Sequence, residues 1–534
     1  MKKSEWGGEF EPSEASAGVI GVYNKSIIAF IEDERLLRRK YNYSNSWGRT
    51  WCQDRAQELG ISADECTILD SQGLTINELN ELNTELAIDG VVRGHYIAKK
   101  YQIHHLKHAW NGYAQSGFTD ASILVMDGCD YPRGTSIAIY SAVDEKIELV
   151  KSYSTEYSLG SFYANGCVNC GFKWFQAGKL MGATSYTIYD DSFVPFFLVD
   201  PFTGIITEQN GRMLYDEQYK FEAPSVELDF NDSLNQIIQN CKPDQNDPSG
   251  FDFRYIKLAA LIQKLFETSV FSLLDFMYNS LPSKNLIISG GCGLNCVLNG
   301  KIIRSNKWNN FFVPTTCDDA GNAIGAAILR CGVKLQEPLI YNKHTYGVPV
   351  EFNKEISDID LAQYILNGQI IAWFEGGSEY GPRALCHRSI IANPQLSYIK
   401  YRINEIKNRE YWRPLAPVIL DSYFPLIFEA NRIWEPHKVM LATEYIKKEW
   451  REKLPGVCAA DGSSRPQVLT NNKYNSVLYN LMSNYNLPIL INTSMNGRGE
   501  PICETPGDAI NFCSNYSDIL LVFVYRGKIY IRGN

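Results

Sequence analysis

The feature that most constrains this chain is a histidine-rich segment followed by an apolar run that ends in a carboxylate. Three of the seven histidines lie between positions 104 and 108. His104 and His108 are four residues apart, so both imidazoles face the same way if the segment is helical. The apolar run 121–126 reads as a short buried strand that ends at Asp127. A carboxylate at the end of a strand, opposite such a helix, predicts a metal site with positions left open for substrate.

The same histidines have a structural interpretation, in which the rings pack against the core and the backbone satisfies their nitrogens. His105 lies about 100° around the helix from each neighbour, so we expect it to make a polar contact and not to bind the metal. Asp318 and Asp319 follow a predicted strand at 310–313 and precede a helix rich in Gly and Ala. Either carboxylate could be a fourth ligand, and one could instead be an N-cap. The small residues of that helix predict very close packing against a neighbour.

Composition narrows the function classes. The 534 residues suggest two to four domains, and the net charge of −9 argues against broad binding to nucleic acid or anionic membranes. No apolar run approaches the ~18 residues of a membrane span. The N-terminus has no apolar region typical of a signal peptide, so the fourteen cysteines are expected to be reduced thiols of a cytoplasmic protein. The lone pair Cys167 and Cys170 is expected to pack in the interior, with a redox or zinc role as the alternative.

Periodicity predicts an α/β chain in two parts. We expect a β-hairpin at 19–31, mostly helix over 46–101, a second hairpin over 135–154, and an irregular surface insertion at 187–250. A long amphipathic helix is predicted at 252–280. The segment 332–355 has two prolines, two glycines and no clear period, as is typical of a linker. The predicted domains are therefore 1–345 and 356–534.

A predicted strand at 285–289 leads into Gly290-Gly291 and a helix, the general form of a phosphate cradle. It is not a Walker loop, because no Gly-Lys-Ser/Thr follows. Lys179, in a segment rich in Gly and aromatic residues, could bring an ammonium group to the same anion. For Lys179 the alternative is a solvated side chain beside helix caps.

The second part carries arginine in loops rich in Gly, Ser and Pro. Such clusters in an acidic protein favour a site for phosphate or nucleotide over solvated surface arginines. The candidates in these loops are Arg383, Arg388, Lys407, Arg409, Arg413, Arg465 and Arg498.

Taken together, several of these segments resemble the nodulation-factor and antibiotic O-carbamoyltransferases. The matching segments are EDERLLRRK, HHLKHA, SLGSFY, GKLMGA, ISGGCGLNC, DDAGNAIGAA, GGSEYGPRALCHRSI, INEIKNREYWRPLAP, DGSSRPQ and INTSMNGRGEPI, in the order of the family. The resemblance implies an N-terminal Kae1-like domain, which is a duplicated actin/Hsp70-like α/β fold, and a C-terminal YrdC-like α/β domain.

The resemblance also implies the chemistry. The C-terminal domain would make carbamoyl adenylate from ATP and carbamoyl phosphate, and the N-terminal domain would transfer the carbamoyl group to an acceptor hydroxyl with the help of a divalent metal, Fe²⁺ in the family. Residue by residue, the metal ligands fall on His104, His108, Asp127 and Asp319. The nucleotide contacts fall on Gly290, Gly291, Asn295, Lys407, Arg409, Asn492, Ser494 and Asn496, and the phosphate contacts on Arg383, Arg388, Arg413 and Arg465.

The sequence departs from the family pattern at two points. Ser13 and Glu14 stand where the family carries a His-Asp pair, with Glu14 as a weak substitute for the base, and Ala459 or Ala460 stands where a histidine is expected. The missing pair leaves a catalytically impaired nucleotide-binding protein open as an alternative. A second alternative is a tRNA threonylcarbamoyl-type transferase, because the resemblance implies that both domain types recur there, although the net charge disfavours it. The expected partners are ATP, carbamoyl phosphate and a hydroxylated small-molecule or sugar acceptor from natural-product biosynthesis. We expect no binding to membranes or nucleic acid. The chain could form a homodimer.

Overall fold

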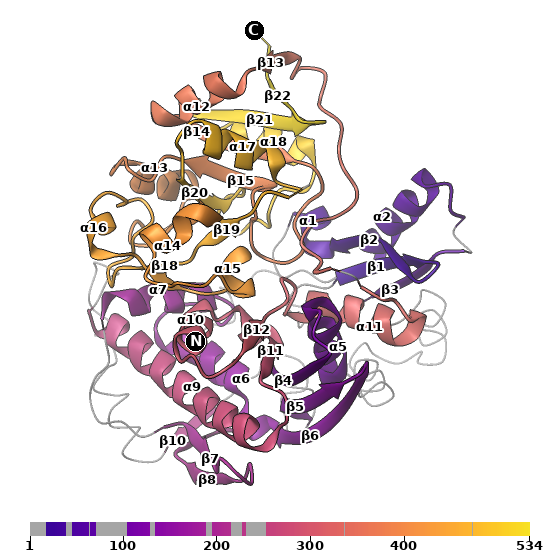
Figure 1. Cartoon of the computed structure of the whole chain (residues 1–534), viewed down its shortest axis with the longest axis vertical. Helices are drawn as coiled ribbons and strands as arrows, with labels where there is room; N and C mark the ends of the chain where they lie inside the picture. Colours follow the sequence, from indigo (N-terminus) through magenta and orange to yellow (C-terminus); the bar gives the residue numbers. More distant parts are fainter. Residues whose placement is uncertain are drawn as a thin grey trace, which may run out of the picture.

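The computed structural model describes residues 18–38, 45–62, 65–70, 104–128, 134–187, 195–214, 227–230, 253–335, 337–472 and 474–533. These residues form a mixed α/β protein whose strands fall into three main sheets (Figure 1). Two sheets belong to the N-terminal part of the chain, and the third is built from residues after 353. This is the α/β class that the sequence predicts. No helix of the described segments combines the length and the apolar character that crossing a bilayer would require.

The first sheet has three antiparallel strands in the order β2-β1-β3, and the second has five in the order β12-β11-β4-β5-β6. In the second sheet, β4 is parallel to β11, and β11 is parallel to β12. The carboxyl ends of these three strands therefore share one edge, where ligand sites form in open α/β sheets. The strands are β1 (Gly18–Tyr23), β2 (Ser26–Glu32), β3 (Thr67–Asp70), β4 (Asp120–Met126), β5 (Thr135–Val143), β6 (Lys146–Ser154), β11 (Asn285–Ser289) and β12 (Asn310–Phe312).

Helices cover these two sheets and carry the sequence motifs. The long helix α9 buries a stripe of apolar side chains against the second sheet, as its amphipathic pattern predicts. The helices of this part are α1 (Asp33–Leu37), α2 (Asn45–Glu58), α5 (His104–Ser116), α6 (Leu159–Asn169), α7 (Ala177–Ala183), α9 (Phe253–Ser280), α10 (Cys296–Arg304) and α11 (Asn322–Cys331).

The third sheet has eight strands in the order β13-β22-β21-β14-β15-β20-β16-β19. Its centre is buried on both faces, which is why β14 reads as a continuous apolar run. β17 and β18 form a separate antiparallel pair. The elements of this part of the chain are β13 (Lys354–Ile356), α12 (Asp358–Leu366), β14 (Ile370–Glu375), β15 (Arg388–Ala392), α13 (Ile399–Ile406), β16 (Ala416–Leu420), α14 (Phe424–Ile427), α15 (Glu435–Lys438), β17 (Glu444–Tyr445), α16 (Lys448–Arg451), β18 (Ser463–Ser464), β19 (Gln467–Leu469), α17 (Ser476–Asn484), β20 (Ile489–Ser494), α18 (Pro506–Cys513), β21 (Ile519–Tyr525) and β22 (Lys528–Ile531).

Two expectations from the sequence are corrected. The segment 46–101 is not simply helical, because β3 lies within it and pairs with β1; residues 71–100 lie outside the described part of the chain. The segment 187–250 is not simply irregular, because it contains β7 (Phe197–Val199), β8 (Ile206–Gln209), β9 (Gly211–Leu214) and β10 (Glu227–Phe230). Phe196 and Phe197 are fully buried beside α9. Both predicted hairpins and the long helix are confirmed. The predicted linker 332–355 is irregular in its described residues up to 353, and β13 begins at Lys354 within it.

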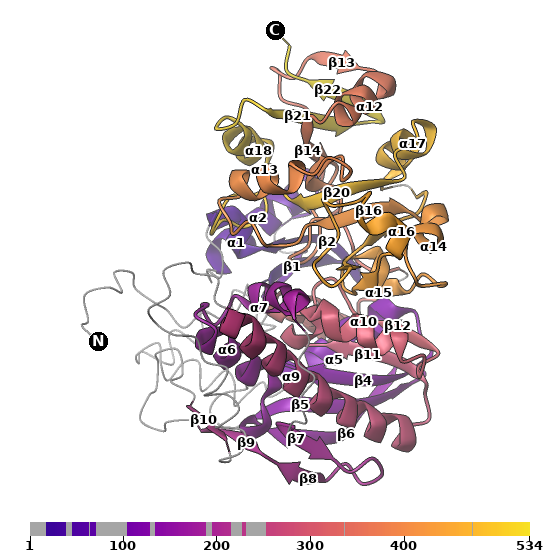
Figure 2. The same cartoon turned by 90° about the vertical axis from the view of Figure 1, so that its left-hand side faces the viewer.

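The two parts are in extensive contact, and the C-terminal part lies against both N-terminal sheets (Figures 1 and 2). One apolar cluster combines side chains of both parts, for example Leu298 and Phe311 with Leu385 and Trp434. Asn299 Nδ2, on α10, donates to the carbonyl of Leu441 at 2.8 Å. Any site between the parts is therefore held by a continuous core.

Candidate functional site

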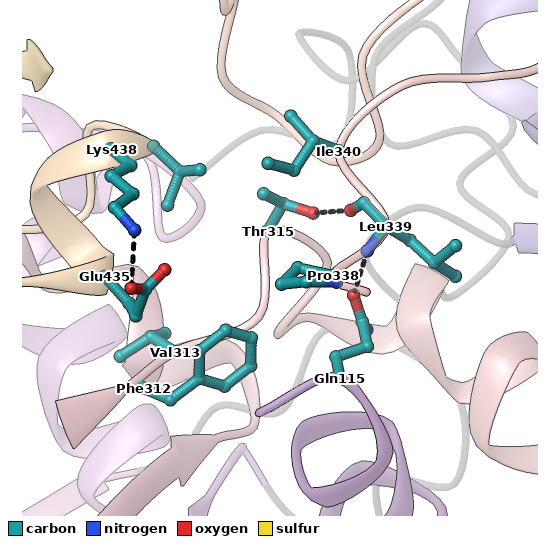
Figure 3. A pocket seen from close by; sticks show the side chains of 10 residues that line it. Gln115, Phe312, Val313, Thr315, Pro338, Leu339, Ile340, Glu435 and Lys438 are labelled. Atoms are coloured by element: carbon teal, nitrogen blue, oxygen red, sulfur yellow. Dashed lines mark hydrogen bonds and ion pairs between the residues drawn. The ribbon is translucent and has the colours of Figure 1, made fainter. Parts of the chain in front are cut away.

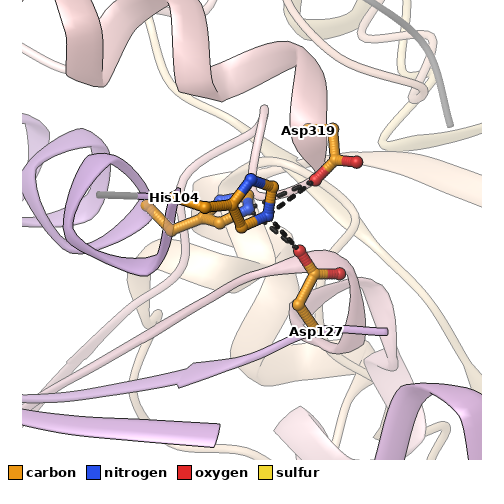
Figure 4. Close-up of side chains that lie close together, drawn as sticks. His104, Asp127 and Asp319 are labelled. Atoms are coloured by element: carbon orange, nitrogen blue, oxygen red, sulfur yellow. Dashed lines mark hydrogen bonds and ion pairs between the residues drawn. The ribbon is translucent and has the colours of Figure 1, made fainter. Parts of the chain in front are cut away.

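Two imidazoles and two carboxylates converge at the edge of the second sheet (Figure 4). His104 Nε2 lies 2.9 Å from Asp127 Oδ2, and His108 Nε2 lies 3.1 Å from the same oxygen. Asp319 Oδ1 lies 3.4 Å from His104 Nε2 and 3.3 Å from His108 Nε2. One ligand atom of each side chain lies within 4.8 Å of the other three. The structure thus brings together the four side chains that the family resemblance assigns to a metal.

Each of these side chains is placed by a rigid element. His104 and His108 are one turn apart on α5, and Asp127 directly follows β4. Asp319 lies in a short 3-10 turn that leads into α11. The predicted close packing of α11 is confirmed, because a Cβ on Gly325 would lie 2.2 Å from the Lys107 carbonyl of α5. Only glycine lets the two backbones approach in this way, and the approach brings Asp319 to the histidines.

The protonation equilibria of the cluster are strongly coupled. Burial lowers the pKa of His104, but its hydrogen bonds to Asp127 and Asp319 outweigh burial and hold that pKa well above its usual range. The pKa of His108 is raised in the same way. Burial raises the pKa of Asp127, but the two histidines outweigh it and hold that pKa well below its usual range. In the absence of an ion, the hydrogen bonds of the cluster therefore favour protonated imidazoles beside an ionised Asp127.

The residues present fit a divalent metal ion. Two nitrogens and two oxygens from fixed elements suit Fe²⁺, Mn²⁺ or Zn²⁺ and leave coordination positions free for substrate. The cluster is only partly exposed: the side chain of Asp127 is 17 % exposed and that of His108 is fully buried. Asp318, the other sequence candidate, is the N-cap residue of the 3-10 turn, and burial with the charges of Glu32 and Asp319 raises its pKa well above the usual range.

Sequence reasoning did not single out Asn322. Its Nδ2 lies 3.3 Å from His104 Nδ1, the nitrogen that faces away from the carboxylates, so it orients that ring; it also lies 3.2 Å from His108 Nε2. The signal was available, because Asn322 is three residues after Asp319 and faces the same side of a helical turn. Ser158, at the N-cap of α6, donates to the Asp127 carbonyl at 3.3 Å and supports the strand end.

The glycine loop after β11 lies directly beside the cluster. Gly290 has φ +86°, and a Cβ there would lie 2.2 Å from the Met126 carbonyl. A Cβ on Gly291 would lie 3.2 Å from Asp127 Oδ1. Asn295, predicted to contact a nucleotide, is instead 5 % exposed, caps α10 and exchanges hydrogen bonds with Gln263. The loop therefore offers backbone and not the Asn295 side chain to a ligand.

Four of the predicted arginines are brought into one region of the C-terminal part. Burial, and then the charges of Arg413 and Arg465, lower the pKa of Arg409 to about 9. Burial and then the charge of Arg465 lower the pKa of Arg383 to about 10. Arg383 Nε and Arg409 Nη2 are buried and have no hydrogen-bond partner among the described residues. Guanidinium groups that repel one another and have buried N–H groups without partners are typical of an anion-binding site.

Lys407 is brought to Ser494 and Asn496, as the family pattern implies. Its Nζ donates to Asn496 Oδ1 at 2.8 Å and to Ser494 Oγ at 3.2 Å. Ser494 Oγ in turn donates to Asn496 Oδ1 at 2.6 Å. The three side chains form one network at the end of β20.

Three of the residues predicted to contact ligand have hydrogen-bond or ion-pair partners within the protein. Arg388 is fully buried, and its guanidinium donates to the carbonyls of residues 375, 376, 387 and 504. Asn492 is fully buried and donates to Gln467 Oε1 at 2.6 Å. Lys179 Nζ lies 2.6 Å from Glu410 Oε1, so a carboxylate of the C-terminal part already occupies its ammonium. Glu14, with Ser13, lies outside the described residues.

A small pocket lies elsewhere, between α5, the end of β12, the 338–340 segment and α15 (Figure 3). Thr315 donates to the Leu339 carbonyl at 2.9 Å, and the Leu339 N–H donates to Gln115 Oε1 at 2.9 Å. Its volume of about 30 Å³ is room for water and not for a nucleotide. The pocket is therefore not a second candidate site.

Comparison with known proteins identifies relatives over most of the chain. Residues 74–328 match the family described as "Carbamoyltransferase N-terminus", and residues 362–526 match "Carbamoyltransferase C-terminus". The nodulation protein U of Sinorhizobium fredii is 34% identical over 74% of this chain and 73% of its own length. The nodulation protein NolNO of the same organism is 27% identical over 95% of this chain and 78% of its own length. Among solved structures, full-length HypF in its phosphate- and nucleotide-bound form is similar over 34% of this chain and 24% of its own, with a TM-score of 0.25 and 17% identity.

Proposed function

This chain belongs to the carbamoyltransferase family, and from that premise we propose that it is an ATP-dependent O-carbamoyltransferase that works through carbamoyl adenylate. Carbamoyl transfer itself follows from the family. The proposal adds the activated intermediate, the division of labour between the two parts, and a hydroxylated small molecule or sugar as the acceptor.

The first step is assigned to the C-terminal part. Carbamoyl phosphate and water give carbamate and phosphate; a carbamate oxygen then attacks the α-phosphorus of ATP, and pyrophosphate leaves. Both substrates are polyanions, so fixed cations are needed to offset their repulsion. Arg383, Arg409, Arg413 and Arg465 supply that charge, and the unsatisfied N–H groups of Arg383 and Arg409 support direct contact with phosphate oxygens. The network of Lys407, Ser494 and Asn496 is assigned to the nucleotide.

The second step is assigned to the cluster at the edge of the second sheet. There the acceptor hydroxyl attacks the carbamoyl carbon, a carbamate ester forms, and AMP leaves. His104, His108, Asp127 and Asp319 would hold a divalent ion, with Fe²⁺ proposed from the family resemblance. When bound, such an ion would withdraw electrons from the carbamoyl group and make AMP a better leaving group. The backbone at Gly290 and Gly291 would lie against the phosphate of the adenylate.

The observation that carries the proposal is the pairing of two complementary sites in one core: a nitrogen-oxygen cluster fit for a metal and a set of partly buried arginines without carboxylate partners at the N–H groups named above. A tRNA substrate would require a basic face, and the net charge of −9 does not favour one. A purely nucleotide-binding protein would bind ATP without turnover, and this distinguishes it from the proposal.

The test is a turnover assay on the full chain reconstituted with Fe²⁺. Incubation with ATP and carbamoyl phosphate should release phosphate and pyrophosphate only when both are present. Arg409→Ala should lower this rate at least ~100-fold, because a developing negative charge loses a fixed partner. Arg526→Ala changes an exposed arginine in the turn between β21 and β22 and should stay within about twofold of wild type. Binding of ATP without carbamoyl-phosphate-dependent release would contradict the proposal.

A further inference from the structure

One residue of the C-terminal part is held at both of its backbone polar groups by a single pair of N-terminal side chains. The N–H of Gly381 donates to Glu32 Oε1 at 2.8 Å, and its carbonyl accepts from Arg35 Nη2 at 2.7 Å. Glu32 and Arg35, at the junction of β2 and α1, are 3 % and 2 % exposed. Their own ion pair measures 3.6 Å, and Arg35 Nη1 lies 3.7 Å from Glu504 Oε2. This arrangement fixes a backbone position and not a side chain.

The loop that contains Gly381 has little room to move. Gly381 has φ +86°, and a Cβ there would lie 2.2 Å from the Thr315 carbonyl of the N-terminal part. On the other side, Glu379 Oε1 accepts three backbone N–H groups of the same loop, those of residues 385, 387 and 388, at 2.8–3.0 Å. The segment from Glu379 to residue 388 is therefore held by its own hydrogen bonds and is in close contact with the N-terminal part at Gly381.

Arg383 follows Gly381 by two residues and is the arginine of the anion region that reaches the N-terminal glycine loop. Its Nη2 donates to the Leu294 carbonyl at 3.4 Å, in the turn that begins at Gly291. Arg465 is near enough for its charge to lower the pKa of Arg383. The Nε of Arg383 is buried and has no partner among the described residues. Arg383 thus lies between the group of arginines and the loop beside the candidate metal cluster.

We propose that Glu32 and Arg35 are positioning residues that hold Arg383 in place through Gly381. By fixing the Gly381 backbone, they keep the guanidinium between the two sites, where it binds the phosphate oxygens of the nucleotide. The assignment rests on the proposed function. A displacement of about 1 Å in such a group is enough to cost a large part of its effect. Neither Glu32 nor Arg35 needs to touch the ligand.

The test is a double-mutant cycle on the full chain, with inorganic pyrophosphate as the probe and Kd measured by calorimetry. Arg383→Ala should weaken binding about tenfold, and Arg35→Gln should weaken it by a similar factor. If Arg35 acts through Arg383, the double variant should match Arg383→Ala within about twofold. Losses that multiply in the double variant, or an unchanged Kd for Arg35→Gln, would overturn the assignment.

Two further variants guard against a general loss of stability. Gly381→Ala leaves the ion pair intact but forces the loop away from Thr315. If Arg35→Gln does not fold, Gly381→Ala takes its place in the double-mutant cycle and should give the same result. Arg304→Gln removes another bond between the parts, from Nη1 to the Thr443 carbonyl at 2.7 Å, and should lower Tm without changing Kd by more than about twofold. A tenfold loss in Arg304→Gln would overturn the assignment. Absence of pyrophosphate binding by the wild type would instead overturn the proposed nucleotide site, on which the assignment rests.

Discussion

Glu375 ends β14 with a carboxyl group that is 8 % exposed. Trp373 Nε1 donates to its Oε2 at 2.9 Å. Burial raises the pKa of Glu375 to about 8, against the lowering effects of that hydrogen bond and of the charge of Arg388. The group therefore holds a proton in the folded protein near neutral pH, whereas an unfolded chain has lost that proton above about pH 4.5.

This gives a pH prediction with a definite sign. Because the folded pKa is raised, the contribution of Glu375 to stability is complete below about pH 4.5 and falls as the pH rises toward 8. Glu375→Gln removes this titration, so its free energy of unfolding should gain on wild type by about 1 kcal/mol per pH unit between pH 5 and 8. Urea unfolding at four pH values measures the difference. Glu452→Gln, at an exposed carboxylate, should run parallel to wild type; parallel curves for Glu375→Gln would contradict the prediction.

The histidines of α5 give a second prediction for single residues. His108→Ala removes a ligand from the cluster and should lower the affinity for Fe²⁺ or Zn²⁺ by at least ~100-fold, because only three of the four donor side chains remain. His105→Asn changes a neighbouring buried histidine outside the cluster and should keep the metal. Metal content after dialysis, with a thermal melt to confirm folding, measures both. Equal metal loss in the two variants would argue against the site.

At the scale of elements, the metal cluster depends on how closely α11 approaches α5. Gly325 has no room for a Cβ, since the Lys107 carbonyl would lie 2.2 Å away. Asp319 precedes α11, and both histidines are on α5. The distance between the two helices therefore sets the distance between the ligands.

Gly325→Ala should push α11 outward, cost about 1–3 kcal/mol of stability, and weaken metal binding more than tenfold. The matched control is Gly332→Ala at the other end of α11, where φ is +63° but no atom lies within 4 Å of an added Cβ. It should cost about 1 kcal/mol through strain alone and leave metal affinity unchanged. Metal titration and urea unfolding of both variants separate the two effects.

The elements also explain what the sequence could predict. Three ligands of the cluster, His104, His108 and Asp127, could be predicted from the sequence because helix spacing and a strand end are local signals. The strand β3 could not be predicted, because its four residues pair with β1, which lies more than forty positions earlier in the chain. Arg383 lies in the loop before β15, and Arg388 is the first residue of β15. Two of the four carbonyls that accept hydrogen bonds from Arg388 lie 13 and 116 positions away. Which guanidinium turns inward depends on these distant contacts.

At the scale of the molecule, α7 of the N-terminal part reaches the arginine region. Lys179 pairs with Glu410, and Tyr186 donates to the Trp412 carbonyl at 2.8 Å. The side chain of Lys179 is 13 % exposed, so the ion pair is partly screened from solvent. Glu410 lies in the same loop as Arg409 and Arg413. Lys179 therefore pairs with a carboxylate whose charge also reaches Arg409 and Arg413.

Lys179→Met should release Glu410 toward those arginines and weaken pyrophosphate binding about three- to tenfold, because a carboxylate then competes with the ligand. Adding Glu410→Gln should restore the affinity, since the competing charge is gone. Lys173→Met changes an exposed lysine of the preceding loop and should have no effect. If the double variant binds as weakly as Lys179→Met, Lys179 contacts the anion directly, as the sequence alone suggested.

The strand order of the third sheet has a consequence for biosynthesis. One of the two strands beside β14, near the middle of that sheet, is β21, although some 140 residues separate β14 and β21 along the chain. A growing polypeptide can complete β14 through β16 and still lack this neighbour until synthesis has passed Tyr525. During translation, the edge of β14 that pairs with β21 therefore has no strand partner. Ribosome-bound chains arrested before residue 519 should recruit chaperones that released chains do not.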